Sequence, residues 1–203
     1  MGLFGPPDIA KLEAKRNFKE LAKAVLEDDA ERRAQAKDAI ARLGSAEVVT
    51  PLTEAADDAS PGEAAVLEAA AALRAVGQPA TDHLAVLTRT GSTEQKTAAA
   101  PFLARMGDEY GLAPLEELAR SPATENRLLA GLALGTDGTP ARIPALEQLY
   151  SDEEAAVRYT AVFSAARIEE PGARELLRRA TGDPEEVVRE AAEEALTMNA
   201  GSE

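Results

Sequence analysis

The sequence predicts an all-α protein built from about six helix-turn-helix repeats that stack on one another. A helical pattern of apolar residues returns every 31 or 32 residues, which is typical of stacked-repeat proteins. Hydrophobic residues make up 45% of the chain but aromatic residues only 3%, so alanine and leucine must form the core. Such a core suits closely packed helices better than a β-sandwich. Prolines and glycines also stand where helices of this period would start and end.

Two series of equivalent residues define the register of the repeats. In the first helices, an anchoring leucine returns at Leu21, Leu52, Leu84, Leu115, Leu146 and Leu177. In the second helices, the corresponding residues are Ile40, Leu73, Leu103, Leu134, Ala165 and Leu196. A basic residue stands seven positions before the second series in five of the six repeats. A period that is maintained over six copies indicates a stack of equivalent units.

Each repeat is expected to contain a first helix, a short turn and a second helix. The first helices are predicted at about residues 8–27, 46–58, 79–90, 109–120, 140–150 and 172–181. The second helices are predicted at about residues 30–43, 61–76, 93–106, 122–135, 153–168 and 184–198.

Residues that start and stop helices support these boundaries. A polar residue stands before a proline at three turns, where it can cap a helix whose first position tolerates proline. These residues are Ser60, Ser121 and Asp183, and Asp152 takes the same place without a proline. A glycine in the left-handed conformation is expected to end three of the second helices. These glycines are Gly44, Gly77 and Gly107.

Four prolines are expected to shape the helices in which they lie. Pro51 and Pro114 directly precede anchoring leucines, and Pro144 lies two residues before one, which predicts bent first helices. Pro101 falls in the middle of the third second helix. A local kink or a break is therefore expected at Pro101.

Composition and charge exclude several classes of function. The formal net charge is −14, so the field of the protein repels phosphate backbones and disfavours nucleic acids as partners. The lack of cysteine excludes disulfides, thiolate nucleophiles and cysteine-based zinc sites. No apolar run reaches the roughly 18–20 residues of a membrane span, and the N-terminus does not resemble a signal peptide. We therefore expect a soluble, cytoplasmic protein.

Residues for catalysis or metal binding are scarce. His83 is the only histidine, and it stands beside the anchoring Leu84 without a companion ligand, so no metal site is expected. No Gly-x-Ser-x-Gly turn is present to position a catalytic serine. Acidic pairs fall at helix ends, where they complement the helix dipole. We expect no catalytic residues, no cofactor and no enzyme activity.

The segment Asp183–Leu196, DPEEVVREAAEEAL, resembles the HEAT repeat, especially the short, alanine-rich type called HEAT-like or bilin-lyase-type. Pro51-Leu52 and Pro114-Leu115 in the first helices share this resemblance. It extends over residues 8–199 as a single domain, with tails at residues 1–7 and 200–203. The resemblance implies a right-handed α-solenoid of about six helix-turn-helix repeats. First helices would lie on its convex side and second helices on its concave side.

The resemblance also implies a role for the recurring basic residue. In such repeats this residue contacts an acidic or capping residue of a neighbouring unit, so that an internal ladder forms. The expected ladder residues are Arg33, Lys96, Arg127, Arg158 and Arg189, and Val66 interrupts the series. Ligand binding by this row is the alternative.

Helical geometry identifies the residues that face away from the core. At about 100° per residue, the positions one and five residues after the ladder residue lie opposite the core positions. In the fourth and fifth repeats these positions carry Leu128, Leu132, Tyr159 and Phe163. A contiguous apolar patch of this kind indicates a binding surface. The alternative is that strong curvature closes the groove and that these residues only fill it.

A sparse basic row accompanies the apolar residues. The position nine residues after the ladder residue carries Arg42, Arg105 and Arg167. We expect Arg105 and Arg167 to bind a partner together with the four apolar residues. An amphipathic helix with acidic residues would suit such a groove.

These observations favour a non-catalytic scaffold or adaptor that binds another protein or a peptide through the concave face. One alternative is a bilin-lyase-like or other regulatory subunit that acts on a partner protein. A second alternative is a DNA glycosylase of HEAT-like fold, which the negative net charge disfavours. The sequence does not determine the oligomeric state.

Overall fold

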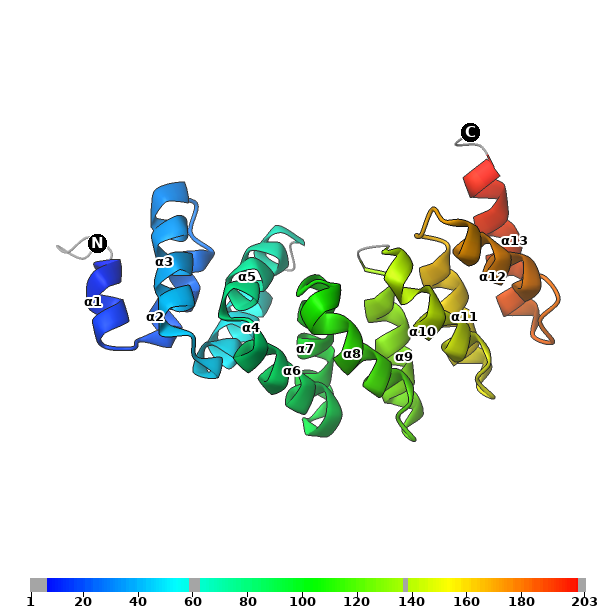
Figure 1. Ribbon diagram of the computed structural model, residues 1–203, viewed down its shortest axis with the longest axis horizontal. Coiled ribbons are helices and arrows are strands. Elements are labelled where there is room, and N and C mark those ends of the chain that lie inside the picture. The colour runs from blue at the N-terminus through cyan, green and yellow to red at the C-terminus, as the bar shows by residue number, and fades with distance from the viewer. Residues whose placement is uncertain (1–6, 59–62, 137–138, 201–203) are drawn as a thin grey trace. The chain divides into compact units, whose positions relative to one another are not determined.

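The computed structural model describes residues 7–58, 63–136 and 139–200, with the backbone alone for Glu63, Asn199 and Ala200. Over these ranges the chain forms helices and turns and contains no strand (Figure 1). The helices are α1 (Ile9–Ala14), α2 (Phe18–Val25), α3 (Ala30–Leu43), α4 (Val49–Asp58), α5 (Glu63–Val76), α6 (Gln78–Thr90), α7 (Thr93–Arg105), α8 (Asp108–Ala119), α9 (Thr124–Leu134), α10 (Ile143–Tyr150), α11 (Ala155–Ala165), α12 (Pro171–Ala180) and α13 (Glu186–Ala200). Two 3₁₀ turns precede α4 and α10, namely η1 (Ala46–Val48) and η2 (Pro140–Arg142). The predicted all-α class is confirmed.

The chain divides into two compact units, Met1–Tyr110 and Gly111–Glu203. In the first unit, α2 pairs with α3, α4 with α5 and α6 with α7, and α3, α5 and α7 pack in series. In the second unit, α10 pairs with α11 and α12 with α13, and α11 packs between α9 and α13. Helix α8 begins in the first unit and ends in the second. Each unit is therefore a stack of helical pairs, as the 31-residue period predicts.

The predicted register places the correct residues in the core. All six anchoring leucines of the first helices are fully buried. In the second helices, the corresponding residues from Ile40 to Ala165 are also buried, and Leu196 is partly exposed. The period was therefore sufficient to identify the residues whose removal from water stabilises each pair.

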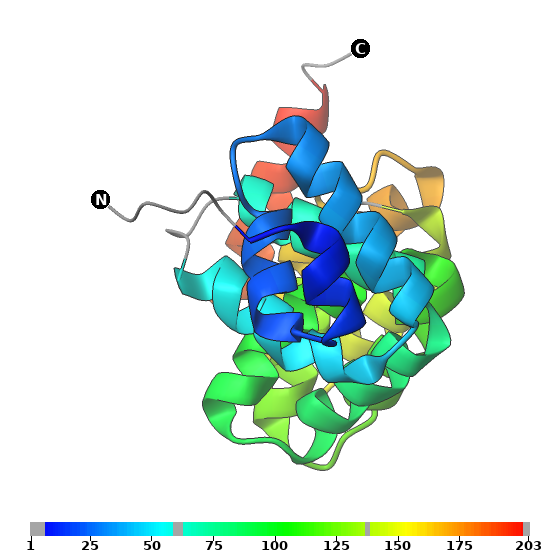
Figure 2. The ribbon, with the colours of Figure 1, turned by 90° about the vertical axis from the view of Figure 1, so that its left-hand side faces the viewer.

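The first helix of the first repeat is not continuous, so the single helix predicted at about residues 8–27 is wrong. The chain turns between α1 and α2, which lie as separate helices beside α3 (Figure 2). Asn17 caps α2 by accepting a hydrogen bond from the Glu20 N–H at 3.3 Å. Arg16 takes a positive φ of 50°, and its guanidinium carbon lies 5.5 Å from the centre of the Phe18 ring. The local capping chemistry of Asn17 overrides the longer apolar pattern here.

The prolines are accommodated without breaking any helix. Pro51 and Pro144 lie in the first turn of α4 and α10, and each of these helices follows a 3₁₀ turn. The first turn tolerates proline because its N–H groups have no partner within the helix. Pro101 lies inside α7, which continues through it, so of the kink or break expected there the break does not occur. Buried Phe102 and Leu103 hold this helix against its neighbours although one backbone hydrogen bond is lost.

The predicted caps lie slightly outside the helices they were assigned to. Ser121 and Asp183 accept hydrogen bonds from N–H groups two residues later, at 3.3 and 2.9 Å. Helices α9 and α13 begin only after these turns, at Thr124 and Glu186. Ser60 lies outside the described residues. Among the glycines predicted to end helices, Gly44, Gly77 and Gly107 have φ values of 54°, 72° and 83°, so that prediction is confirmed.

Candidate functional site

The second unit carries the four apolar residues that were predicted to bind a partner: Leu128, Leu132, Tyr159 and Phe163. In α9 the five positions expected to face the core are all buried: Asn126, Ala130, Gly131, Ala133 and Leu134. The equivalent residues of α11 are also buried: Val157, Ala161, Val162, Ser164 and Ala165. The opposite side of each helix must therefore face away from the packed layer, as the 100° geometry predicts.

The exposed side of α9 and α11 is apolar. Leu132 is 51% exposed and Phe163 is 46% exposed, while Leu128 and Tyr159 are partly exposed. The Tyr159 and Phe163 rings stack, with centroids 6.4 Å apart and an interplanar angle of 18°. We call these four residues the apolar patch. Exposed side chains of this size on adjacent helices are uncommon on a surface that contacts only water.

The two helices that carry the apolar patch, α9 and α11, approach each other closely. A Cβ atom on Gly135 would lie 2.5 Å from Ser164 Oγ and 2.8 Å from Ser164 Cα, and one on Gly131 would clash with the Thr160 hydroxyl. The Ser164 hydroxyl donates a hydrogen bond to the Gly131 carbonyl at 2.7 Å. The two glycines, four residues apart, thus let the helices approach more closely than any side chain would permit. Neither glycine belongs to the repeat positions from which the patch was predicted.

The corresponding positions on α13 are acidic. Glu190 lies 31 residues after Tyr159, and Glu194 lies 31 residues after Phe163. Both glutamates are exposed, and α13 packs against α11. The apolar patch is therefore bordered by carboxylates on the side of α13.

Two of the predicted ladder arginines reach an aspartate of the following repeat. Arg127 Nε lies 2.6 Å from Asp152 Oδ2, and its Nη2 lies 3.0 Å from Oδ1. Arg158 makes the same bidentate contact with Asp183, at 2.9 and 3.0 Å. The side chains of Asp152 and Asp183 are only 9% and 2% exposed. Buried, bidentate pairs of this kind are the strong form of the arginine–carboxylate contact.

Each of these arginines also binds the turn of its own repeat. Arg158 Nη1 donates to the carbonyls of Asp152 and Glu153, both at 3.0 Å. Arg127 Nη1 binds the Ser121 and Pro122 carbonyls in the same way, at 3.1 and 3.2 Å. One guanidinium therefore joins two consecutive turns.

The ion pairs change the pKa values of both aspartates. Burial alone raises the pKa of Asp183, but hydrogen bonds from Arg158 and from the Glu185 N–H outweigh it and hold that pKa below its usual value. For Asp152, burial is outweighed by hydrogen bonds from Arg127 and from the Glu154 N–H, so its pKa is also lowered. Hydrogen bonds to Asp152 and Asp183 raise the pKa values of Arg127 and Arg158.

The other predicted ladder residues do not form a bidentate pair with a buried aspartate among the described residues. Arg189 Nη1 binds the Asp183 and Pro184 carbonyls at 2.7 and 2.8 Å, and Arg189 forms no bidentate pair with a carboxylate among the described residues. Arg33 binds the carbonyls of its own turn and lies 3.4 Å from a glutamate, Glu68, on α5. Lys96 makes no side-chain hydrogen bond or ion pair within the described ranges. A lysine cannot provide the planar fork that binds a carboxylate and a carbonyl together.

The predicted basic row does not form one surface in the second unit. Arg42 pairs with Glu13 at 2.7 Å in the first unit. Arg105 also belongs to the first unit, where it lines a cavity of about 580 Å³ with Val66, Thr97 and Phe102. Arg167 is exposed on the second unit, one helical turn after Phe163. Arg167 is thus the residue of this row that belongs to the unit carrying the apolar patch.

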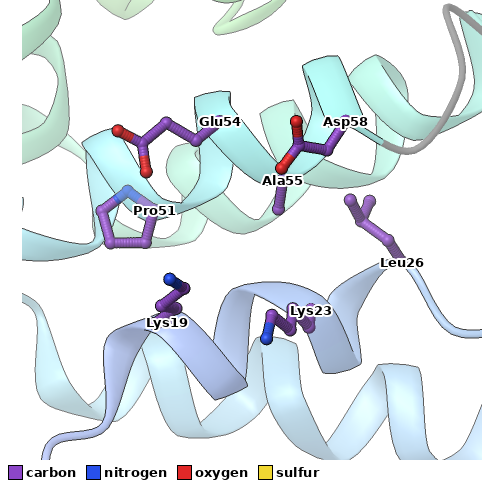
Figure 3. A pocket seen from close by; sticks show the side chains of 7 residues that line it. All are labelled: Lys19, Lys23, Leu26, Pro51, Glu54, Ala55 and Asp58. Atoms are coloured by element: carbon purple, nitrogen blue, oxygen red, sulfur yellow. The ribbon is translucent and has the colours of Figure 1, made fainter.

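A second hollow in the first unit lies between α2 and α4 and has a volume of about 300 Å³ (Figure 3). Lys19 and Lys23 line the side of α2, and Glu54 and Asp58 line the side of α4. Lys23 forms an ion pair with Glu20 of its own helix, at 2.8 Å. Because its walls carry opposite charges in equal number, this hollow does not select a ligand of one charge.

One structural arginine could not have been found from the sequence. Arg142, in η2, is only 1% exposed, and its Nη1 donates to the carbonyls of Ala133 and Leu134 at 3.5 and 3.3 Å. It thereby satisfies the last carbonyl groups of α9. Arg142 occupies no position of the repeat pattern, so no periodic signal distinguishes it from a surface arginine.

His83 is partly exposed on α6 in the first unit. No group of three histidine, aspartate or glutamate side chains in the described part of the chain could hold a metal ion. None of the described helices has the length and apolar character needed to cross a membrane.

Comparison with known proteins agrees with the repeat architecture. Residues 111–197 match the family model described as HEAT repeats, so the predicted resemblance is confirmed for the second unit. No curated protein matches the chain. A structure of human deoxyhypusine hydroxylase in complex with glycerol is 18% identical, with 95% of this chain and 88% of that chain covered and a TM-score of 0.47. A designed armadillo repeat protein in complex with the peptide (KR)4 is 21% identical, with coverages of 95% and 86% and a TM-score of 0.44. At these TM-scores the likenesses say nothing about function.

Proposed function

We propose that this protein, whose second unit consists of HEAT repeats, is a non-catalytic adaptor that binds another protein through the apolar patch. The observation that carries the proposal is the exposure of Leu132 and Phe163 on adjacent helices whose other sides are fully packed. An amphipathic helix is the partner element that suits such a face, because its apolar stripe can cover residues on two neighbouring helices.

The alternative, that the four residues only fill the groove, predicts different burial. Side chains that fill a groove would be buried like Leu146, which is 0% exposed. Phe163 and Leu132 instead keep about half of their surface in contact with solvent. A partner that covers them would gain free energy from the area removed from water, about 25 cal/mol per Å².

Tyr159→Ala with Phe163→Ala is expected to weaken partner binding by about 30-fold, since burying the exposed part of each ring contributes about 1 kcal/mol. The same change should lower the free energy of unfolding by about 1–2 kcal/mol, against about 2–5 kcal/mol for Leu146→Ala. Partner binding can be measured with a photo-crosslinking phenylalanine analogue placed at Leu132, followed by adduct analysis in native cell extract. Unfolding can be followed by circular dichroism.

Val86 provides the matched control, because it is 47% exposed on α6 of the first unit. The analogue at Val86 should give no discrete adduct, whereas the analogue at Leu132 should give one that the double substitution removes. Equal labelling from both positions would contradict the proposal. A loss of stability as large as that of Leu146→Ala would also contradict it, because it would show that the rings belong to the core.

A further inference from the structure

The charged residues around the apolar patch indicate the charge of the partner, which the hydrophobicity of the patch alone does not. Across α9, α11 and α13, one row of equivalent positions reads Leu128, Tyr159 and Glu190, and the next reads Leu132, Phe163 and Glu194. Each row therefore changes from apolar to acidic in the same direction. Glu190 and Glu194 are exposed, and within the described ranges neither forms an ion pair.

We infer that the segment bound by the apolar patch is a basic amphipathic helix whose lysine or arginine side chains contact Glu190 and Glu194. This inference rests on the proposed function and adds the charge and orientation of the partner. An acidic helix, which the predicted row of arginines suggested, would place its carboxylates beside two uncompensated glutamates. Like charges brought together in this way oppose binding.

The spacing of the helices specifies where the basic residues stand in the partner. Packed helices lie about 8–10 Å apart, which corresponds to about five to seven residues along a helix that crosses them, and a spacing of about seven residues, two helical turns, keeps side chains on one face. A helix that crosses α9, α11 and α13 would thus place one apolar residue on α9 and another on α11, about seven residues apart. Its basic residues would follow about seven residues later. Arg167, the exposed cation near Phe163, would repel basic residues from the α11 side and so supports this order.

Two synthetic helical peptides of about 20 residues test the inference. Both carry leucines at the two apolar positions, and they differ only in having lysine or glutamate at the third. The full-length protein should bind the lysine peptide in isothermal titration calorimetry at physiological salt and bind the glutamate peptide at least about tenfold more weakly. Glu190→Gln with Glu194→Gln should weaken binding of the lysine peptide by about fivefold to tenfold, as expected for two partly exposed charge pairs.

Glu147→Gln with Glu175→Gln is the matched control, since it removes the same net charge from exposed residues of α10 and α12 in the same unit. This control should change the affinity less than twofold, which separates local contact from general attraction to an acidic protein. Equal losses in both variants, equal binding of the two peptides, or no binding of the lysine peptide would overturn the inference. If Tyr159→Ala with Phe163→Ala removed binding while the Glu190 and Glu194 substitutions did not, only the charge assignment would fail. If the apolar substitutions had no effect on binding, the proposed function would fail as well.

Discussion

Asp183→Ala is expected to lower the free energy of unfolding by about 3 kcal/mol at pH 7. The substitution leaves the guanidinium of Arg158, which is 11% exposed, without its carboxylate. It also removes the acceptor of the Glu185 N–H at the start of the last turn. Arg158 keeps its bonds to the carbonyls of Asp152 and Glu153, so the loss should fall at the lower end of the range for a broken buried pair.

Glu175→Ala is the appropriate control for this substitution. The Glu175–Arg178 pair has both side chains 60% exposed and should contribute no more than about 1 kcal/mol. Urea unfolding followed by circular dichroism suits both measurements, because the protein has no tryptophan to report by fluorescence. Equal losses for the two substitutions would show that the Arg158–Asp183 pair does not stabilise the stack.

The same pair should make stability depend on pH in the acidic range. The pKa of Asp183 is lowered in the folded state, so its contribution is fully present above the unfolded pKa and is lost as pH falls through the folded value. Asp152 acts in the same direction. The unfolding free energy of the wild type should therefore fall below about pH 4 more steeply than that of Asp183→Asn. Parallel curves for the two proteins between pH 5 and about pH 2 would contradict this assignment.

Gly131→Ala with Gly135→Ala is expected to destabilise the second unit by about 3 kcal/mol. The added Cβ atoms would collide with Thr160 and Ser164, and at Gly135 one of the contacts is with backbone, which cannot rotate away. Overpacking costs about 1–3 kcal/mol at each site, which exceeds the gain of about 1 kcal/mol from replacing glycine in a helix. The result can be measured by thermal unfolding, and partner binding should weaken too because α9 and α11 are forced apart.

Gly172→Ala offers the comparison for this effect. A Cβ atom there would meet only two side-chain methyl carbons of Ile143, at 3.3 and 3.4 Å, and no backbone atom, so the change should be close to neutral. A neutral result for the Gly131 and Gly135 pair as well would mean that the two helices do not need their close approach.

Much of the candidate site followed from local periodicity. The positions of Leu132 and Phe163 on the exposed side follow from about 100° per residue, which depends only on the geometry of one helix. The ladder series identified Arg127 and Arg158 correctly as members of one row, but it did not identify which acids they bind. Arg158 reaches Asp183, 25 residues later, because α11 and α13 pack side by side.

Features that depend on contacts between helices were missed. Arg105 and Phe163 belong to different units, so the predicted role of Arg105 beside the apolar patch stays a prediction. The sequence places Glu190 and Glu194 at positions equivalent to Tyr159 and Phe163. That they border the patch follows only from the packing of α13 against α11. Arg142 carried no periodic signal at all.

By itself, the sequence determined the all-α class, the 31-residue repeat, the buried leucines and the apolar character of the exposed face. These properties follow from the order of residues along single helices, since burial of one helical face is the main force that sets the pattern. Only the tertiary structure decided which carboxylate each arginine binds, where two glycines let helices meet, and which charges border the patch. Those contacts join residues far apart in the chain, and their geometry depends on how the helices pack rather than on any local spacing.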